Sequence, residues 1–444
     1  MPIKSGGRRN PKSNPKNKVK AFQTAFTSGE LDPQMRMRSD LKPFFTGARS
    51  LQNASLLVQG GAKRRDGMRY RALLGAASTL HEYSFTEGQD YVLAFQNGKV
   101  LIYNSSGTLL QTLTSMPWDA DEVKELTVAA SADTIIVCHK DNPIHRILRT
   151  GATTFTEAAF VFEIDSSGAP KRQPYFKFVA DAVTMTPSAT TGSINLTCST
   201  DHFVSGHAGT IFRYSTSATL STYKEILVNS ITSATVAACT VRETLAATTA
   251  QVHWDEQTFS AVRGYPRSVC FHDQRLCFAG STNRPDGFWA SKAGGFFNFD
   301  VDDATDEDSI DATISADDIA EIRHLISSRN IQIFTNGGEM YIPTSAGNPL
   351  TPGNLQFLPQ TPYGCEQKVN PIKFDGATLF LQKTGSVIRE FIFNDLEQAH
   401  TSNAVSPTSN HLLKTVVDSA VLLGTDTRPE QYAFFVNSDG TVAV

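Results

Sequence analysis

The chain has 444 residues and no pair of cysteines at the Cys-x-x-Cys spacing of zinc and redox motifs. Its six cysteines are scattered, and we expect buried free thiols kept in a reducing compartment. They are Cys138, Cys198, Cys239, Cys270, Cys277 and Cys365. Cys270 and Cys277 are predicted to lie seven residues apart on one strand, which is poor spacing for zinc ligands.

Signatures of membrane insertion and of several enzyme classes are also missing. No apolar run approaches the ~20 residues needed to cross a bilayer, and no signal peptide is recognised. There is no P-loop, no Gly-x-Gly-x-x-Gly and no Gly-x-Ser-x-Gly elbow, and the ten histidines form no ligand set along the sequence. The net charge of -4 predicts no general attraction to nucleic acid. We therefore expect no catalytic residue, no cofactor, no metal and no small-molecule substrate, so the chain is not predicted to be an enzyme.

What the sequence does contain is a recurring hairpin. Two short apolar strands flank a tight turn, which is Asn-Gly, Thr-Gly or Asp-Gly. The four clear copies span Tyr91–Tyr103, Ile331–Ile342, Ala377–Phe391 and Tyr432–Val444. Two weaker copies span Thr134–Leu148 and Ser268–Ser291, the second with its turn predicted between Asn283 and Asp286.

The spacing of these hairpins indicates the fold. From Ile331 to Ala377 to Tyr432 the repeat is close to the length of one four-stranded propeller blade. We predict an all-β protein: a propeller-like scaffold with an inserted small β-barrel and a short helical N-terminal segment, predicted over Asp40–Gln52. The last hairpin reaches Val444, so the final blade looks incomplete. Either early strands close the ring or the natural chain continues.

Composition divides the chain into four parts. Residues 1–20 carry seven basic side chains and no acidic one, which predicts a disordered tail, either solvated or ordered against an acidic partner or nucleic acid. Residues 21–175 form the first part of the scaffold. Residues 176–252, rich in Thr, Ser and Ala, form the inserted five- or six-stranded barrel. Residues 253–444 form the second part of the scaffold.

Two charged groups are candidate sites. Asp300–Glu321 has ten carboxylates and no basic residue, and neither EF-hand register fits it. It could be a solvated loop, a loose Ca²⁺ site, an acid and base pair for glycoside cleavage, or an electronegative surface that keeps a passing DNA duplex from sticking. The residues considered for that lumen-facing surface are Asp300, Asp302, Asp303, Asp306, Glu307, Asp308 and Asp311.

The second charged group is basic and follows a double glycine. Its members are Lys63, Arg64, Arg65 and Arg69. It could be a solvated turn, or it could contact another subunit or an adaptor protein.

Several motifs, in order, resemble those of the tail nozzle proteins (tail tubular protein B) of short-tailed bacteriophages. The N-terminal block comprises Ser28-Gly29-Glu30-Leu31-Asp32-Pro33, Arg38-Ser39-Asp40-Leu41, Gly47-Ala48-Arg49, Asn53 and Gln59-Gly60-Gly61-Ala62-Lys63-Arg64-Arg65. A second block comprises the run Phe271–Gly280, then Phe288–Ser291, Gly295–Phe299, Asp308–Asp311, Arg323–Ser328 and Asn336–Glu339. Gln360–Gly364 and Val387–Glu390 match later strands. The resemblance covers roughly residues 21–150 and 264–400.

This resemblance implies a virion structural protein, assembled in the host cytoplasm and located in the tail. It implies a homo-hexameric ring that contacts portal-adaptor proteins and tail fibre or spike proteins. Genomic DNA would pass through without sequence recognition. The rival from another class is a tail-associated glycan-binding or glycan-hydrolysing propeller, and a third option is a capsid-exterior or minor stabilising protein.

Overall fold

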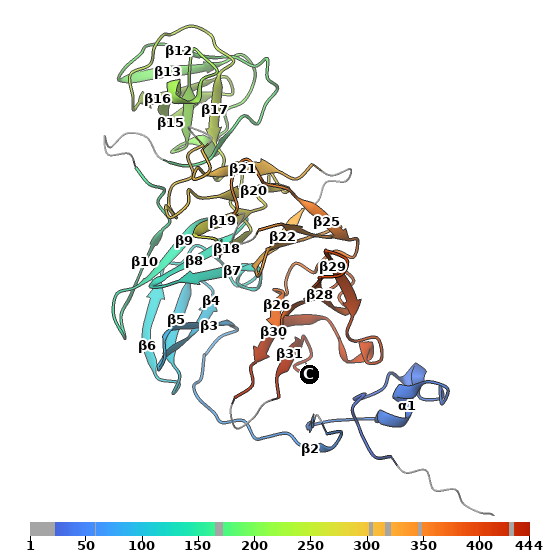
Figure 1. Cartoon of the computed structure of the whole chain (residues 1–444). Helices are drawn as coiled ribbons and strands as arrows, with labels where there is room; N and C mark the ends of the chain where they lie inside the picture. Colours follow the sequence, from blue (N-terminus) through green and yellow to red (C-terminus); the bar gives the residue numbers. More distant parts are fainter. Residues whose placement is uncertain are drawn as a thin grey trace, which may run out of the picture. The chain divides into compact units, whose positions relative to one another are not determined.

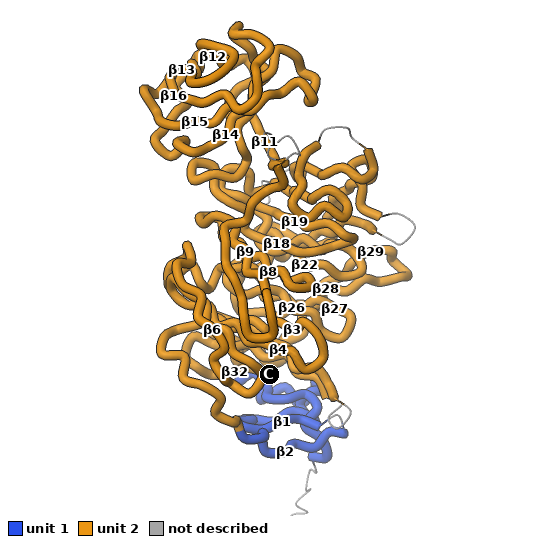
Figure 2. Tube along the Cα trace, turned by 90° about the vertical axis from the view of Figure 1, so that its left-hand side faces the viewer, with its two compact units in different colours: residues 1–67 blue, residues 68–444 orange. Residues whose placement is uncertain are grey.

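A computed structural model describes residues 23–57, 59–164, 172–301, 305–315, 321–344, 349–425 and 430–444. The chain divides into two compact units, residues 1–67 and residues 68–444, which Figure 2 colours separately. The predicted basic tail 1–20 lies outside the described residues, as do Asp302 and Asp303. Within the described part, no helix has the length and apolar character needed to span a bilayer.

The smaller unit contains short elements only. They are the 3-10 turn η1 (Pro33–Met35), the helix α1 (Lys42–Thr46) and a two-stranded antiparallel sheet of β1 (Ala54–Leu56) and β2 (Ala62–Arg64). The helix predicted over Asp40–Gln52 is thus confined to five residues. It stops at Gly47 because Ala48 pairs with Glu30 and draws the chain into an extended conformation.

The larger unit contains a six-bladed β-propeller, which confirms the predicted scaffold (Figure 1). Blades 1 to 5 are four-stranded antiparallel sheets whose strands follow chain order, and blade 6 has three strands. Blade 1 consists of β3 (Thr79–Thr86), β4 (Gln89–Gln96), β5 (Lys99–Asn104) and β6 (Leu109–Thr114); blade 2 of β7 (Thr127–Ser131), β8 (Thr134–His139), β9 (Asn142–Arg149) and β10 (Phe155–Ala159); blade 3 of β18 (Ser268–His272), β19 (Arg275–Ala279), β20 (Gly287–Ala290) and β21 (Ile310–Thr313); blade 4 of β22 (Ile322–Ser327), β23 (Ile331–Thr335), β24 (Glu339–Ile342) and β25 (Leu358–Thr361); blade 5 of β26 (Ile372–Phe374), β27 (Ala377–Leu381), β28 (Ile388–Asn394) and β29 (Ala399–Ala404); blade 6 of β30 (Val416–Leu422), β31 (Tyr432–Asn437) and β32 (Val442–Ala443).

The predicted hairpins are found at their predicted turns, with one exception. Gly98 and Gly385 have φ of 63° and 71°, as tight hairpin turns require. In blade 3 a turn that the sequence analysis missed separates β18 from β19: Asp273 and Gln274 adopt φ of 44° and 62° without a glycine. The prediction that Cys270 and Cys277 share one strand is therefore wrong, because they face each other across this hairpin.

The core lies between the blades. Along β8, Ile135 and Val137 pack in a cluster with blade 1, whereas Ile136 and Cys138 pack with blade 3. Further clusters join blades 3 and 4, blades 4 and 5, and blades 5 and 6. All six cysteines are free and buried, which confirms that part of their prediction. Each inner sheet thus buries both of its faces, which explains strands that are apolar throughout rather than alternating.

Blades 1 and 6 have no such cluster between them among the described residues. Ala94, Leu101 and Tyr103 of blade 1 pack instead against Ala72 and Leu74, which precede β3. Blade 1 has four strands of its own, and in the part of the chain that the structure describes no N-terminal strand pairs with the three strands of blade 6.

The inserted segment forms one seven-stranded sheet with a separate core. Its strand order is β11-β17-β14-β15-β16-β13-β12, from β11 (Tyr175–Phe176), β12 (Met185–Pro187), β13 (Ser193–Cys198), β14 (Ile211–Tyr214), β15 (Lys224–Ser233), β16 (Val236–Val241) and β17 (Trp254–Gln257). One bridge between Met185 and Gln251 brings the β12 edge against the chain that leads into β17. The strand pairing itself leaves the sheet open between β11 and β12, so the barrel stays a prediction.

The buried histidines predict acid sensitivity of this fold. Burial lowers the pKa of His81, His202, His324 and His400 to about 4. The unfolded chain takes up these protons below pH ~6.5, whereas the folded chain resists them until pH ~4, so stability falls across this window. For fully buried His324 we expect a loss of about 2 kcal/mol between pH 8 and pH 5, measured from urea unfolding midpoints.

A glutamine variant isolates the contribution of one histidine. The Nε2 of His324 lies 2.9 Å from the carbonyl oxygen of Glu366, and a glutamine amide can donate to the same acceptor. His324→Gln should therefore make the stability loss between pH 8 and pH 5 smaller by about 2 kcal/mol. An unchanged pH dependence would contradict this reading.

Candidate functional site

The acidic segment is bound to blade 3 by basic side chains and is not simply a solvated loop. The Asp308 side chain is 3% exposed, and its carboxylate accepts from Lys292 Nζ at 2.9 Å and from the Thr305 amide at 2.7 Å. Burial opposes ionisation of Asp308, but these hydrogen bonds outweigh it and lower the pKa. Asp306 and Glu307 remain exposed.

Arg275 binds the backbone of the same segment. This guanidinium is fully buried and donates to the carbonyl oxygens of Ser291 and Asp308, both at 2.6 Å, and of Asp306 at 2.8 Å. Arg275 lies in the matched block Phe271–Gly280. Its role in this structure is to position the acidic segment.

Two other carboxylates of the segment face the inserted sheet. Asp311 pairs with Arg284 at 2.8 Å, and burial raises the pKa of Asp311 although Arg284 opposes the shift. The Arg284 guanidinium lies 4.3 Å from the ring of Phe176 in β11 and 4.9 Å from that of Trp289. Asp300 pairs with Arg172, which leads into the inserted sheet. These contacts anchor the insertion on blade 3.

The lumen-facing role of the segment stays a prediction. Its strand β21 is the outermost of blade 3, and neighbouring blades meet instead through first strands such as β7 and β18. A lumen that it lined would therefore belong to an assembly of several copies and not to the axis of this propeller. Among residues 305–315 and 321, the structure shows no group of three ligands suited to a metal ion.

Three of the four residues of the basic group lie on or directly after a small hairpin of the smaller unit, whereas Arg69 belongs to the larger unit. Lys63 and Arg64 belong to β2, pairing with Ser55 and Ala54 of β1, and the Arg65 amide donates to the carbonyl oxygen of Asn53 at 2.8 Å. Arg64, Arg65 and Arg69 are exposed, and Lys63 is half-buried. The group is thus accessible in the single chain, as a contact with another protein would require.

A polar network crosses the axis of the propeller. The Gln367 amide donates to the carboxylate of Glu125. Glu125 immediately precedes blade 2 and Gln367 precedes blade 5, and these blades lie opposite each other in a ring of six. Arg267 and Glu321, which precede blades 3 and 4, add an ion pair at 2.5 Å. The axis is therefore obstructed by side chains where these segments meet.

Sequence reasoning missed this axial network completely. Glu125 and Gln367 are separated by 242 positions, and neither belongs to a motif or to a charged run. The only signal in the sequence is that Glu125 and Gln367 each come shortly before the first strand of a blade. This signal can be read only when the limits of the blades are known.

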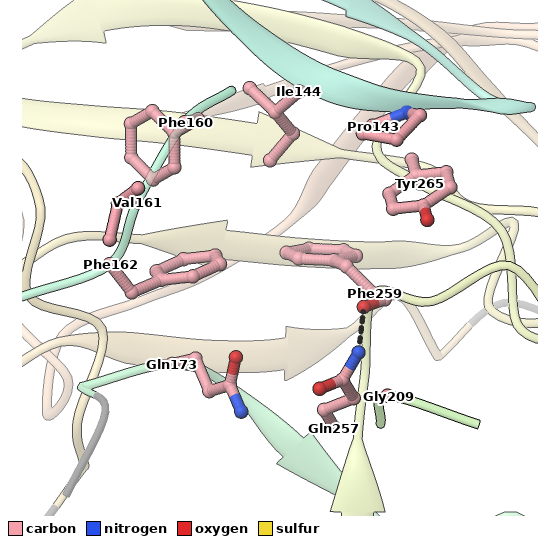
Figure 3. A pocket seen from close by; sticks show the side chains of 10 residues that line it. All are labelled: Pro143, Ile144, Phe160, Val161, Phe162, Gln173, Gly209, Gln257, Phe259 and Tyr265. Atoms are coloured by element: carbon pink, nitrogen blue, oxygen red, sulfur yellow. Dashed lines mark hydrogen bonds between the residues drawn. The ribbon is translucent and has the colours of Figure 1, made fainter. Parts of the chain in front are cut away.

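A cavity lies at the junction of the insertion and the propeller. It has a volume of about 190 Å³, and Figure 3 shows Phe160, Phe162 and Phe259 around it. The other lining residues are Pro143, Ile144, Val161, Gln173, Gly209, Gln257 and Tyr265. Gln257 donates to the carbonyl oxygen of Phe259 at 2.9 Å, so this amide is used in the structure of the wall.

Comparisons with known proteins were made by family, by sequence and by structure. No protein-family model and no curated protein sequence matches the chain. Several solved propellers are similar at low identity. The match to apo AztD from Citrobacter koseri covers 79% of this chain and 77% of the AztD chain, at 10% identity and a TM-score of 0.33. The match to the propeller domain of Myceliophteria thermophila Cps50 (Swd1) covers 82% of this chain and 93% of that domain, at 7% identity and a TM-score of 0.33. The match to YCF48 from Cyanidioschyzon merolae covers 83% of this chain and 96% of YCF48, at 12% identity and a TM-score of 0.33.

Replacing Arg275 tests how the acidic segment is anchored. Arg275→Met would leave three carbonyl oxygens without their donor, two of them in buried hydrogen bonds, and we expect a loss of about 3 kcal/mol in unfolding free energy. Arg329→Met is the matched control, because Arg329 is 69% exposed and its pair with Asp395 should contribute less than about 1 kcal/mol. Equal urea midpoints for the two variants would refute the anchoring role.

Proposed function

We propose that this chain is a structural subunit of the tail nozzle of a short-tailed bacteriophage. The observation that carries the proposal is the ordered series of motifs from Ser28 to Glu390 that resembles the nozzle family. The propeller fold is compatible with that series, because the run Phe271–Gly280 forms the hairpin of β18 and β19 and supplies Arg275 to the anchor of the acidic segment.

In the proposed role, DNA does not pass through a single propeller. The hydrogen bond between Glu125 and Gln367 and the ion pair between Arg267 and Glu321 occupy the axis. A conduit must then be formed by several copies around a common opening. A heterologous interface that closes on itself gives such a ring, and the nozzle resemblance leads us to propose six copies.

The proposed subunit acts mechanically and catalyses no reaction. The ring would close the conduit before infection, hold tail fibres or spikes, contact the portal-adaptor proteins, and let the genome leave afterwards. The exposed acidic side chains Asp306 and Glu307 suit a surface that repels phosphates, if the ring turns them inward.

Particle mass and shape test the proposal directly. We expect mass photometry of the purified chain, alone or with its portal-adaptor partner, to show six times 48.4 kDa for the ring. Negative-stain images should show a six-fold ring with a central opening. A compact monomer that binds or cleaves an oligosaccharide would overturn the nozzle role and favour the glycan-directed propeller.

Charge reversal of the basic group tests whether it is an assembly contact. Lys63→Glu, Arg64→Glu and Arg65→Glu together should abolish the ring, because like charges then face the acidic surface that the bases would meet. The monomer should keep its circular dichroism spectrum, since these side chains stand on an exposed hairpin.

A second triple variant serves as the control for this experiment. Arg329→Glu, Lys383→Glu and Lys414→Glu alter three exposed bases of the propeller by the same total charge. This variant should assemble as the unaltered chain does. Rings formed equally by both variants would exclude the basic group from the interface.

A further inference from the structure

Three potential metal ligands converge at the start of blade 2. Glu122 belongs to the 3-10 turn η2 (Glu122–Glu125), and His139 and Asp141 lie at the hairpin between β8 and β9. One ligand atom from each of the three side chains lies within 4.8 Å of the others. Glu122 Oε1 is 3.8 Å from His139 Nδ1, a separation that a shared cation can span after a small adjustment.

The environment of His139 suits a ligand that binds through Nδ1. This side chain is 4% exposed, and burial lowers its pKa although Glu122 and Asp141 oppose the shift. The backbone amide of Asp141 points at Nδ1 at 3.3 Å, so the lone pair is on Nδ1 and the proton on Nε2. A cation bound at Nδ1 would replace this long contact. Nε2 in turn faces Glu125 Oε2 at 3.9 Å. A carboxylate behind the second ring nitrogen is the usual support of a metal-bound histidine.

The side chain of Asn142 marks the place of the cation. Its Nδ2 donates to Glu122 Oε2 at 2.9 Å and lies 3.1 Å from His139 Nδ1, and Asn142 is 9% exposed. One positively polarised group thus already lies between two of the potential ligands. Turning the amide over would present Oδ1 instead, which adds a hard oxygen ligand without moving the backbone.

We propose that Glu122, His139 and Asp141 bind one divalent transition-metal cation, with Asn142 Oδ1 as a further ligand and Glu125 as the positioning residue for His139. One imidazole with oxygen ligands is a donor set suited to Zn²⁺ or Mn²⁺. Asp141 is 46% exposed, so the cation can enter from solvent, and the other carboxylate oxygen of Asp141 can keep its pair with Lys140. This site does not depend on the proposed tail role.

The bound cation would stiffen the axial network. Glu125 stands behind His139 and also accepts from Gln367, which precedes blade 5. A cation at His139 therefore restrains the segment that bridges blades 2 and 5.

A second group of potential ligands fits a metal less well. His202, His207 and Glu256 are all buried in the inserted sheet, within 4.8 Å of one another. The Val204 amide donates to Nδ1 of His207 at 3.0 Å, which leaves the proton on Nε2, where it donates to Glu256 at 3.1 Å. Arg263 also pairs with Glu256. Arg263 thus already neutralises the buried Glu256 carboxylate, and a cation at this place would have to displace that guanidinium.

Calorimetric titration of the chelator-treated full chain with ZnCl₂ alone, and separately with MnCl₂ alone, tests the site. We expect one saturable equivalent of at least one ion, together with a rise of several degrees in the melting temperature. His139→Gln and Glu122→Gln should each weaken binding at least tenfold. Glu125→Gln should weaken it about tenfold while leaving the stoichiometry unchanged.

Two control variants separate this site from the alternatives. His145→Gln alters another buried histidine of the same sheet, paired with Glu157 at 2.7 Å, and should bind the ion within twofold of the unaltered chain. His207→Gln should do the same. Loss of binding in His207→Gln but not in His139→Gln would transfer the site to the inserted sheet. Absence of saturable binding by both ions would overturn the proposal.

Discussion

The packing of one sheet face against the next blade is the interaction on which the rest of this structure depends. Successive residues of β8 alternate between two hydrophobic clusters, so the strand stabilises blade 1 with one face and blade 3 with the other. A single four-stranded sheet could not bury both faces alone. This arrangement holds the segments before the first strands close together, which is why Glu125 and Gln367 meet across the ring.

Polar side chains perform the positioning that the apolar clusters cannot. Apolar packing has little directionality, whereas Arg275 specifies the path of the acidic segment through three hydrogen bonds, and Arg284 ties the inserted sheet to blade 3 through Phe176 and Asp311. The same charges that suggested a DNA-repelling surface are therefore partly neutralised inside the chain. Asp306 and Glu307 keep their exposure and remain available for that role.

The all-β class, the blade spacing and the four hairpins with glycine turns could be predicted because each depends on local chemistry. At Gly98, Gly385 and Gly440 a glycine with positive φ and a short apolar run on each side leave few alternatives. The hairpin at Asp273 and Gln274 was missed because its positive φ angles are adopted by non-glycine residues, which the surrounding sheet must enforce. The length of the N-terminal helix was overestimated for a similar reason. The pairing of Ala48 with Glu30, which ends the helix after five residues, is a contact between separate segments.

The sequence by itself determined the type of unit, its repetition and the presence of an insertion of different composition, because period and turn chemistry act over a few residues. The tertiary structure decided which distant groups meet. Glu122 with His139, Arg275 with the acidic segment, and Glu125 with Gln367 are brought together by the order of the blades. The positions of these residues along the sequence do not show that they are in contact. In a different arrangement of the same sheets, they would face solvent or other partners.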